Sequence, residues 1–490
     1  MNKKILLVLV AVLALVFVFT GCESYDFGPV AGDDYSKELV IGNGGVAVQQ
    51  GNYLYFVNGS AGIAADNTFG KVVKGAIMRY KVDSNGALVG EPVTIVPKAA
   101  YGTSTVSGIY VYGEWIYYAS PSTATDSEGN VQTDDIVFFR TKTNGTDTEK
   151  LLTLKGLSTE YAFSENALIY VTTNLSSSSA STYTITSVDY ETKESSVITD
   201  KATAYVIPRE TKFDAKSTKV NADGYVYYTK ASEELSDFNN EVWVAKMDNS
   251  YNAKMIGKYS YFADAEKDKY EANDFSIGTP DYNKIFTIVP VKYANGVLYY
   301  AKYISENGSS VNKGVYSYDV ENYLNTTKKF DGSLETTWST LTTYSTLYPT
   351  DNKETLIVAT TSKMYILTPG EGVVAGVFAE EIFPTVKTVL AVKDGYMFYY
   401  TSTSNDIYKI KITTEGEEKE NAVKITNVTP NSTWRIMEMT GDFIYYVHPD
   451  YNYVYRINTA LEKTDDNYDV MLGKYNEADQ KLVDKANENN

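Results

Sequence analysis

The feature of the sequence that most constrains its fold is a short phrase that recurs along almost its whole length. In each copy a turn residue precedes four or five apolar and aromatic residues, which in most copies end in a pair of tyrosines. The eight copies centre on Tyr55, Tyr117, Ile169, Tyr227, Tyr299, Ile357, Tyr399 and Tyr445. Recurrence at this period indicates a fold assembled from similar supersecondary units rather than around one large core.

Each repeat unit contains further short strands. Most copies are followed by a second strand with a central aromatic residue, as around Tyr80 and Tyr455, and by turn residues that lead to another strand. Runs of Val, Ile and Tyr between Gly, Asn and Asp predict strands, whereas long amphipathic helix patterns are nearly absent. We therefore predict an all-β fold, a seven- or eight-bladed β-propeller of four-stranded antiparallel blades over residues 41–460. The copy at Ile357 lacks the tyrosine pair, which leaves both blade numbers open.

The blade architecture offers a reason for the abundance of tyrosine, which accounts for 44 of the 490 residues. Blades stack face against face, so an inner strand is covered on both sides and can be apolar at successive positions. A tyrosine ring fills the space between blades while its hydroxyl reaches a polar edge. We therefore interpret most tyrosines as core residues, with stacking of exposed tyrosines on carbohydrate as the alternative.

The N-terminus has the pattern of a secretion signal. Lys3 and Lys4 precede an apolar run over residues 5–19, which is too short to span a membrane comfortably but suits a signal-peptide core. The following Thr20-Gly21-Cys22 resembles the bacterial lipobox, and this resemblance implies cleavage before Cys22 and diacylation, as by palmitate, of its sulfur. We predict a lipoprotein signal peptide over 1–21, a polar tether over 22–40, and a lipid anchor on the extracytoplasmic face of the cell membrane. A plain signal peptide with a chance cysteine is the alternative.

Two further predictions concern the ends of the folded body. Propellers commonly complete one blade with strands from both ends of the chain, and segment 46–48 is the candidate partner of the final hairpin at 454–457. This pairing predicts that a shared blade closes the ring. Residues 461–490 form an acidic tail, in which 470–486 has a helical pattern with Glu477 and Lys481 one turn apart.

Composition excludes several classes of site and partner. With 62 acidic against 44 basic residues, a net charge of −18, nucleic acid is not an expected partner. A single His and a single Cys exclude zinc sites with several such ligands and the common nucleophilic triads. No phosphate-binding loop or calcium loop has the required spacing. We predict no cofactor, no metal and no catalytic residue, and we interpret His448 as a polar surface residue rather than a general base.

One repeat unit carries a family resemblance. The strand from Gly113 to Ser120, followed by the segment 139–146 and by Leu151 and Leu152, resembles a Tyr-rich family of bacterial surface propellers of unknown function, related to TolB-like repeats. The other copies repeat parts of the same phrase. The resemblance implies the propeller fold and a place on the cell surface, and it implies no activity.

A long insertion is the segment in which we first expect a ligand. It spans 248–283, between the copies at Tyr227 and Tyr299, and loops that elaborate a rigid scaffold often carry its function. Its candidate ligand-contacting residues are Tyr251, Tyr259, Tyr261, Tyr270 and Tyr282. We predict a binding or scaffolding module for a protein partner or a cell-envelope glycan. The alternative is a glycan-active hydrolase or lyase that uses carboxylates on the propeller rim.

Overall fold

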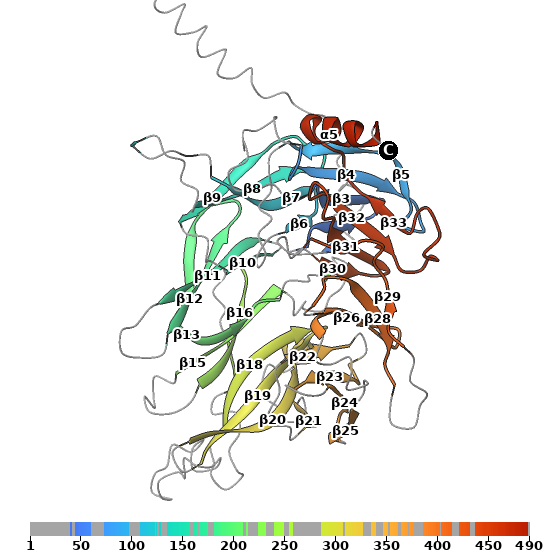
Figure 1. Ribbon diagram of the computed structural model, residues 1–490. Coiled ribbons are helices and arrows are strands. Elements are labelled where there is room, and N and C mark those ends of the chain that lie inside the picture. The colour runs from blue at the N-terminus through green and yellow to red at the C-terminus, as the bar shows by residue number, and fades with distance from the viewer. Residues whose placement is uncertain are drawn as a thin grey trace, which may run out of the picture.

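The computed structural model shows a β-propeller, in which antiparallel sheets follow one another around a ring (Figure 1). It describes residues 40–41 and, with gaps, 45–488. The longer gaps are 60–72, 98–107, 129–134, 175–180, 214–223, 232–239, 249–253, 258–285, 327–334, 340–345, 377–385, 414–420 and 432–436. The all-β prediction is confirmed, and the described helices are only α4 (Val320–Asn325) and α5 (Glu477–Asn487).

Six of the described sheets have four strands each. The first two are β2 (Ala47–Gln50), β3 (Tyr53–Val57), β4 (Ile77–Val82) and β5 (Leu88–Val96), then β6 (Ile109–Tyr112), β7 (Trp115–Pro121), β8 (Asp135–Lys142) and β9 (Glu149–Lys155). The next two are β18 (Phe286–Ala294), β19 (Val297–Glu306), β20 (Ser309–Asp319) and β21 (Glu335–Ser339), then β22 (Thr346–Pro349), β23 (Leu356–Ala359), β24 (Met364–Thr368) and β25 (Gly372–Gly376). The last two are β26 (Val386–Lys393), β27 (Tyr396–Thr401), β28 (Ile407–Lys411) and β29 (Val423–Lys424), then β30 (Met437–Thr440), β31 (Phe443–Val447), β32 (Val454–Asn458) and β33 (Asp469–Met471).

A seventh sheet contains two copies of the repeat. Its strands are β10 (Glu160–Phe163), β11 (Ala167–Asn174), β12 (Thr182–Asp189), β13 (Ser195–Val206), β15 (Tyr225–Ala231), β16 (Asn240–Lys246) and β17 (Lys254–Gly257). The long strand β13 pairs with β12 through its first part and with β15 through its last part. Eight repeat units therefore form seven blade sheets, and the copy at Ile357, which lacks the tyrosine pair, forms a complete sheet of its own. A two-residue pair, β1 (Val40–Ile41) with β14 (Lys212–Phe213), lies outside the blades.

Tight turns explain why each tyrosine pair follows Gly, Asn-Gly or Asp-Gly. Asn295 and Gly296, which join β18 to β19, have φ values of 51° and 78°. Asp394 and Gly395 repeat this geometry between β26 and β27, at 52° and 77°. Two successive residues with positive φ match the twist of the flanking strands, and this is why such dipeptides begin the repeated phrase.

The paired tyrosines supply the core between blades, as the sequence predicted. Tyr117 packs in a cluster with Phe163 of the following sheet, whereas Tyr118 packs in a cluster with Tyr55 of the preceding sheet. Successive side chains of a strand point to opposite faces, and both faces are covered by neighbouring blades. Because all three tyrosines have almost no exposed surface, the core-packing interpretation holds for them.

The two ends of the ring meet side by side. An apolar cluster joins Ala47 and Phe56 of the first sheet to Tyr445 and Val454 of the last. Each of these sheets is built from one continuous stretch of chain, so the predicted closure by a shared blade is wrong. The reason lies in a contact across the ring closure, where the Glu438 carboxylate accepts the backbone N–H groups of residues 46 and 47 at 2.7 and 3.0 Å. The segment that was expected to pair with the final hairpin therefore has its backbone N–H groups bonded to a side chain instead.

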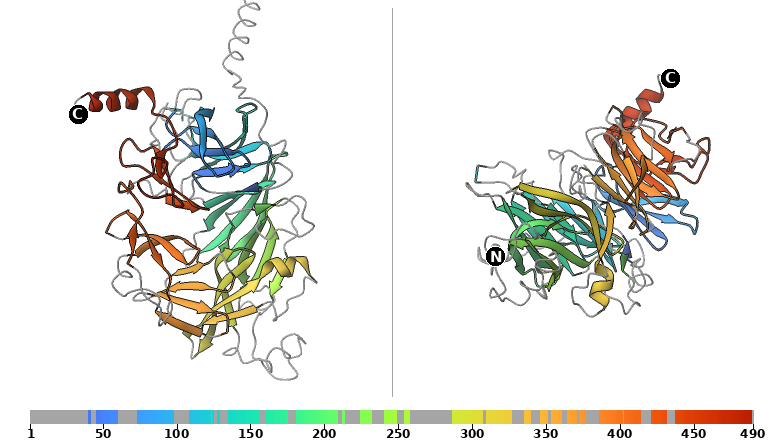
Figure 2. Two further views of the ribbon diagram at one scale, coloured as in Figure 1. Left: turned by 90° about the vertical axis from the view of Figure 1, so that its right-hand side faces the viewer. Right: turned by 90° about the horizontal axis from the view of Figure 1, so that it is seen from below.

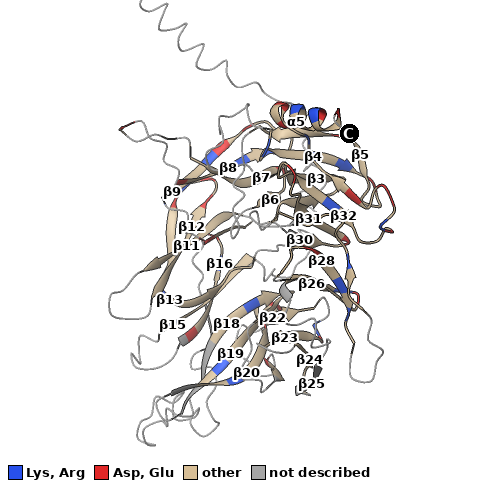
Figure 3. Cartoon of the chain, in the orientation of Figure 1, with Lys and Arg blue, Asp and Glu red and all other residues tan. Residues whose placement is uncertain are grey.

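The chain after the last sheet fastens this seam. Asn58, which is completely buried, donates from its side-chain amide to the Lys474 carbonyl and accepts from the Lys474 N–H, at 2.8 and 3.1 Å. Asp479 of α5 accepts the Tyr453 hydroxyl at 2.8 Å and pairs with Lys74 at 3.3 Å. Figure 2 shows α5 projecting from the edge of the molecule, and its charges of both signs are interspersed (Figure 3). The tail thus connects the last sheet to the first.

Candidate functional site

The residues that the sequence put forward as sites lie outside the described part of the chain. This applies to the lipidation candidate Cys22 and to the tyrosines of the insertion, Tyr251, Tyr259, Tyr261, Tyr270 and Tyr282. Within the described residues, no helix is long and apolar enough to cross a membrane. The same part of the chain has no group of three or more His, Cys, Asp or Glu side chains arranged to hold a metal ion. We therefore examined the polar and aromatic clusters that the structure does describe.

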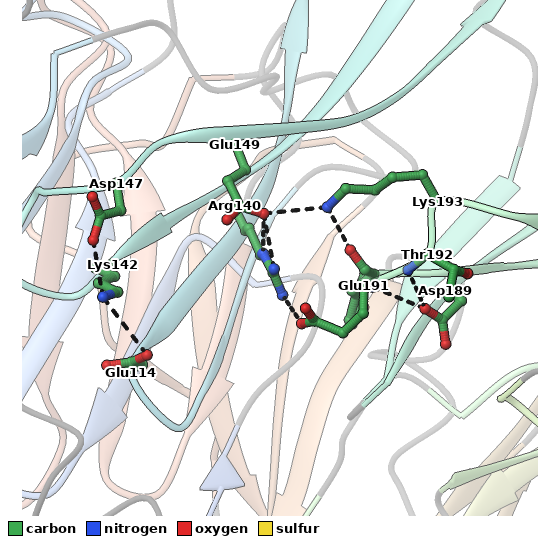
Figure 4. Close-up of polar contacts among 10 residues, drawn as sticks. Glu114, Arg140, Lys142, Asp147, Glu149, Asp189, Glu191, Thr192 and Lys193 are labelled. Carbon is green, nitrogen blue, oxygen red and sulfur yellow. Dashed lines mark hydrogen bonds and ion pairs between the residues drawn. The ribbon is translucent and has the colours of Figure 1, made fainter.

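The densest network of charges surrounds Arg140 on β8 (Figure 4). Its guanidinium contacts Glu149 at 2.8 Å and Glu191 at 2.7 Å, and it lies over the Trp115 ring, 4.3 Å from the ring centroid. Lys193 also contacts Glu149, at 3.2 Å. Partial burial alone would raise the pKa of Glu149, but hydrogen bonds from Arg140 and Lys193 lower it below its usual value. The network joins the sheet β6–β9 to the seven-stranded sheet.

The same arginine recurs at two other blade junctions. Arg79 lies over Tyr53 and donates to the Thr143 carbonyl of the next sheet at 3.1 Å. Arg456 lies over Phe443 and donates to the Gly86 carbonyl across the seam at 2.9 Å. Both arginines and Arg140 stand opposite the first tyrosine of their own pair. Because the arrangement belongs to the repeat, we assign it to packing between blades rather than to a ligand.

A second group of side chains on the last sheet occurs with the only histidine of the sequence. His448 follows β31, Tyr455 lies on β32 opposite Tyr446, Asp469 begins β33, and Tyr475 precedes α5. We call these five residues the last-blade cluster.

The rings of the last-blade cluster are in direct contact. The ring centroids of His448 and Tyr455 are 4.4 Å apart with stacked planes, and those of Tyr446 and Tyr455 are 5.9 Å apart. Tyr475 forms a hydrogen bond with Tyr455, which, with burial, raises the pKa of Tyr455. His448, Tyr455 and Tyr475 are only partly buried. The cluster therefore presents aromatic surface and polar atoms together.

The environment of His448 selects one protonation state. Burial lowers its pKa, although the Asp450 carboxylate, 3.7 Å from Nδ1, acts in the opposite direction. The backbone N–H of Asp450 donates to Nδ1 at 3.1 Å. Because Nδ1 accepts this bond, the proton of the neutral ring lies on Nε2. Nε2 has no hydrogen-bond partner among the described residues, and it can donate to a ligand.

Asp469 and Tyr446 form the buried side of the cluster. The Tyr446 hydroxyl donates to the two carboxylate oxygens of Asp469, at 2.9 and 3.0 Å. Burial raises the pKa of Asp469, and this hydrogen bond partly offsets the effect. Burial and the nearby carboxylate both raise the pKa of Tyr446. The pair holds Tyr446, and through it Tyr455, in a fixed position.

The turn beside the cluster contains an unusual residue. Tyr451 and Asn452 connect β31 to β32 with φ values of 58° and 61°. Asparagine tolerates this conformation, but a bulky tyrosine rarely adopts it. The Tyr451 ring packs edge-on against Tyr475, with centroids 5.8 Å apart. Strained residues persist where their surroundings determine them, and they concentrate at functional sites.

The sheet β18–β21 contains the same arrangement with different polar groups, which shows what is particular to the last blade. Its members are Tyr300, Lys302, Tyr316 and Glu335, in the places of Tyr446, His448, Tyr455 and Asp469. Lys302 pairs with Glu335 at 2.5 Å and lies over the Tyr316 ring at 3.9 Å. Burial lowers the pKa of Lys302 to about 8, although Glu335 acts in the opposite direction. In the sheet β18–β21, Lys302 is therefore bound to Glu335, whereas in the last blade the Nε2–H group of His448 stays available as a donor.

The last-blade cluster could not be recognised from His448 by itself. The signal lies in the alignment of the copies, in which the second residue after each tyrosine pair is polar. Asn58 and Ser120 occupy this place in the first two sheets, and Lys302 and His448 occupy it in the two clusters just compared. The partners Asp469 and Tyr475 come from separate segments, and no spacing rule indicates that they meet.

The solved structures to which the chain is similar include β-propellers of low sequence identity. The chain is 11% identical to the β-propeller domain of the trilobed protease from Pyrococcus furiosus, with a TM-score of 0.33, over 90% of this chain and 100% of that one. It is 9% identical to apo AztD from Citrobacter koseri, with a TM-score of 0.34, over 90% and 97% of the two chains. It is 10% identical to a prolyl endopeptidase, with a TM-score of 0.37, over 88% of this chain and 57% of that one. No protein-family model and no curated protein matches the chain. At this level the likenesses carry no argument about activity.

Proposed function

We propose that the protein is a lipid-anchored, extracytoplasmic β-propeller that binds a protein partner or a cell-envelope glycan. The observation that carries the proposal is the last-blade cluster, where partly exposed aromatic rings surround an imidazole with an available donor. Tyrosine surfaces with hydroxyl groups contribute large contact area at low conformational cost, which suits recognition. The net charge of −18 disfavours nucleic acid and anionic lipid as direct partners of the propeller.

The anchor part of the proposal rests on the sequence. Cys22 directly follows the apolar run of the signal, and it is the only cysteine of the chain. Acyl chains on its sulfur would attach an acidic body that the membrane surface itself repels. The insertion tyrosines stay a prediction for a second contact region.

The experiment compares the natural chain with a Cys22→Ser variant in cells. We expect the natural protein in the membrane fraction and the variant in the medium or periplasm. The released variant, immobilised on beads, should capture a component of solubilised cell envelope. A variant that stays in the membrane fraction would contradict the anchor, and failure to capture any glycan or protein would contradict the binding function.

A further inference from the structure

We infer that the last-blade cluster is a binding site for a sugar ring that carries no negative charge, an inference that rests on the proposed function. Glycans are favoured over proteins here because the cluster is small, aromatic and polar at once. A sugar ring presents a face of C–H groups to an aromatic ring and hydroxyl groups around its edge. One side of the Tyr455 ring is stacked on His448, and Tyr475 packs edge-on against Tyr451, but both tyrosines keep part of their surface exposed beside the His448 donor.

The hydrogen-bonding groups of the site complement a sugar. The neutral His448 ring can donate from Nε2 to a hydroxyl oxygen, because its other nitrogen is occupied by the Asp450 N–H. The Asp450 side chain is 74% exposed and accepts from a sugar hydroxyl group or amide. Donor and acceptor thus come from one turn, and different hydroxyl groups of one sugar can use them.

The charges around the cluster select against anionic sugars. Asp450 is close to His448, and Asp469 lies on the next strand. The neighbouring Lys463 donates to the carbonyl oxygens of Lys424 and Thr426, at 3.3 and 3.1 Å. With His448 neutral, a uronate or a phosphate-bearing polymer would meet the exposed Asp450 carboxylate, whereas the Lys463 ammonium group is already bonded to backbone carbonyls. An uncharged hexose, an N-acetylated sugar or an amino sugar meets no such repulsion.

The related sheet β18–β21 provides the internal contrast. The Lys302 side chain is 7% exposed and bound to Glu335, so the polar groups of the two residues are already engaged with one another. The His448 side chain is 12% exposed and is not bonded to Asp469 among the described contacts. The same frame of two tyrosines and an acid is therefore closed in one blade and available in the other. Tyr316 is the structural counterpart of Tyr455 and serves as its control.

The test is titration calorimetry on the released Cys22→Ser protein with two probes. The neutral probe is a tetramer of β-1,4-linked N-acetylglucosamine, and the anionic probe is tetragalacturonate. We expect the neutral tetramer to bind with a dissociation constant of about 1 mM or tighter and the anionic tetramer not to bind in that range. Tyr455→Leu should weaken binding about tenfold, and Tyr316→Leu should leave it unchanged, provided that both variants melt cooperatively.

A second variant guards against a folding failure of Tyr455→Leu. His448→Gln removes the ring while keeping a polar side chain at the surface, and we expect it to weaken binding of the neutral tetramer about fivefold to tenfold. The inference is overturned if the neutral tetramer does not bind, if tetragalacturonate binds as well, or if the variants and the Tyr316 control lose binding equally. If the released protein captures an envelope protein but no saccharide, this inference fails and the proposed function stands.

Discussion

At the scale of the residue, position within the repeat decides what a side chain does. The first tyrosine of a pair stands opposite an arginine in three blades, and the second faces the preceding sheet. Periodicity predicted the burial of these tyrosines because an apolar pair has to be covered on both faces. It did not predict the roles of Arg140 or Asp469, because each depends on a partner from another segment.

Gly473 provides a test of the hydrogen bonds between Asn58 and Lys474, which join the tail to the first sheet. A Cβ at this position would lie 1.5 Å from the Asn58 side-chain oxygen, so Gly473→Ala must displace a fully buried and fully bonded amide. We expect a loss of about 2 kcal/mol in the free energy of unfolding, measured by denaturant titration. The matched control is Gly224→Ala, where a Cβ meets nothing within 4 Å. Equal stability of the two variants would show that the hydrogen bonds between Asn58 and Lys474 do not contribute to the free energy of unfolding.

The junction arginines provide a second test at this scale. Arg140→Lys keeps the charge but loses the planar group that contacts Glu149 and Glu191 while lying over Trp115. We expect a loss of about 1 kcal/mol of stability, a modest value because both carboxylates are partly or largely exposed. Lys81→Gln, at an exposed position of β4, is the control and should change stability by less than about 0.5 kcal/mol. The account is contradicted if Arg140→Lys is as stable as the natural protein.

At the scale of the element, the repeat predicted strands far better than it predicted connections. Tyrosine pairs after Asn-Gly or Asp-Gly correspond to the strands β19 and β27, whose hairpins the turn residues determine locally. The shared strand β13 could not be foreseen, because one continuous run of twelve residues serves two repeat units. Ring closure could not be foreseen either, because it depends on Glu438, 391 residues from the backbone group of Ala47 that it binds.

Truncation of the tail tests whether α5 fastens the seam. A chain that ends at Lys474 loses Asp479 and with it the contacts to Tyr453 and Lys74. We expect its melting temperature to fall by several degrees, from a loss of about 1–2 kcal/mol. A chain that ends at Leu482 keeps these contacts and should melt close to the natural protein. If both truncated chains melt alike, the helix does not hold the ring.

At the scale of the whole molecule, the sequence predicted the architecture, whereas the place of the binding site stays a prediction. Eight copies of one phrase predict a ring of similar blades, and the ring is present. The sequence places candidate ligand contacts in the insertion at 248–283, whose tyrosines lie outside the described residues, whereas the proposed last-blade site lies within a regular repeat unit. His448 and Asp469 occupy the places that Lys302 and Glu335 hold in a related blade, so the proposed site differs from that blade by two polar side chains.

The buried tyrosines make the stability of the whole molecule sensitive to alkaline pH. Burial raises the pKa of Tyr55, Tyr117 and Tyr299 to about 12, from an ordinary value of 10.0. The folded state therefore holds these protons more tightly than the unfolded state, and their contribution is complete below pH 10 and declines as the pH rises toward 12. We expect the denaturant midpoint to fall steeply over this range. A denaturant midpoint that stays constant between pH 10 and pH 12 would contradict this expectation.

The central claim is that a lipid-anchored propeller binds its ligand at the last blade. Hydrogen–deuterium exchange of the released Cys22→Ser protein, with and without the tetramer of N-acetylglucosamine, measures this across the whole chain at once. If the ligand binds at the last-blade cluster, we expect slower exchange on ligand binding in β31 and β32, in the turn that contains Tyr451, and in the segment that contains Tyr475. Protection confined to 248–283, with no change in the last blade, would contradict it.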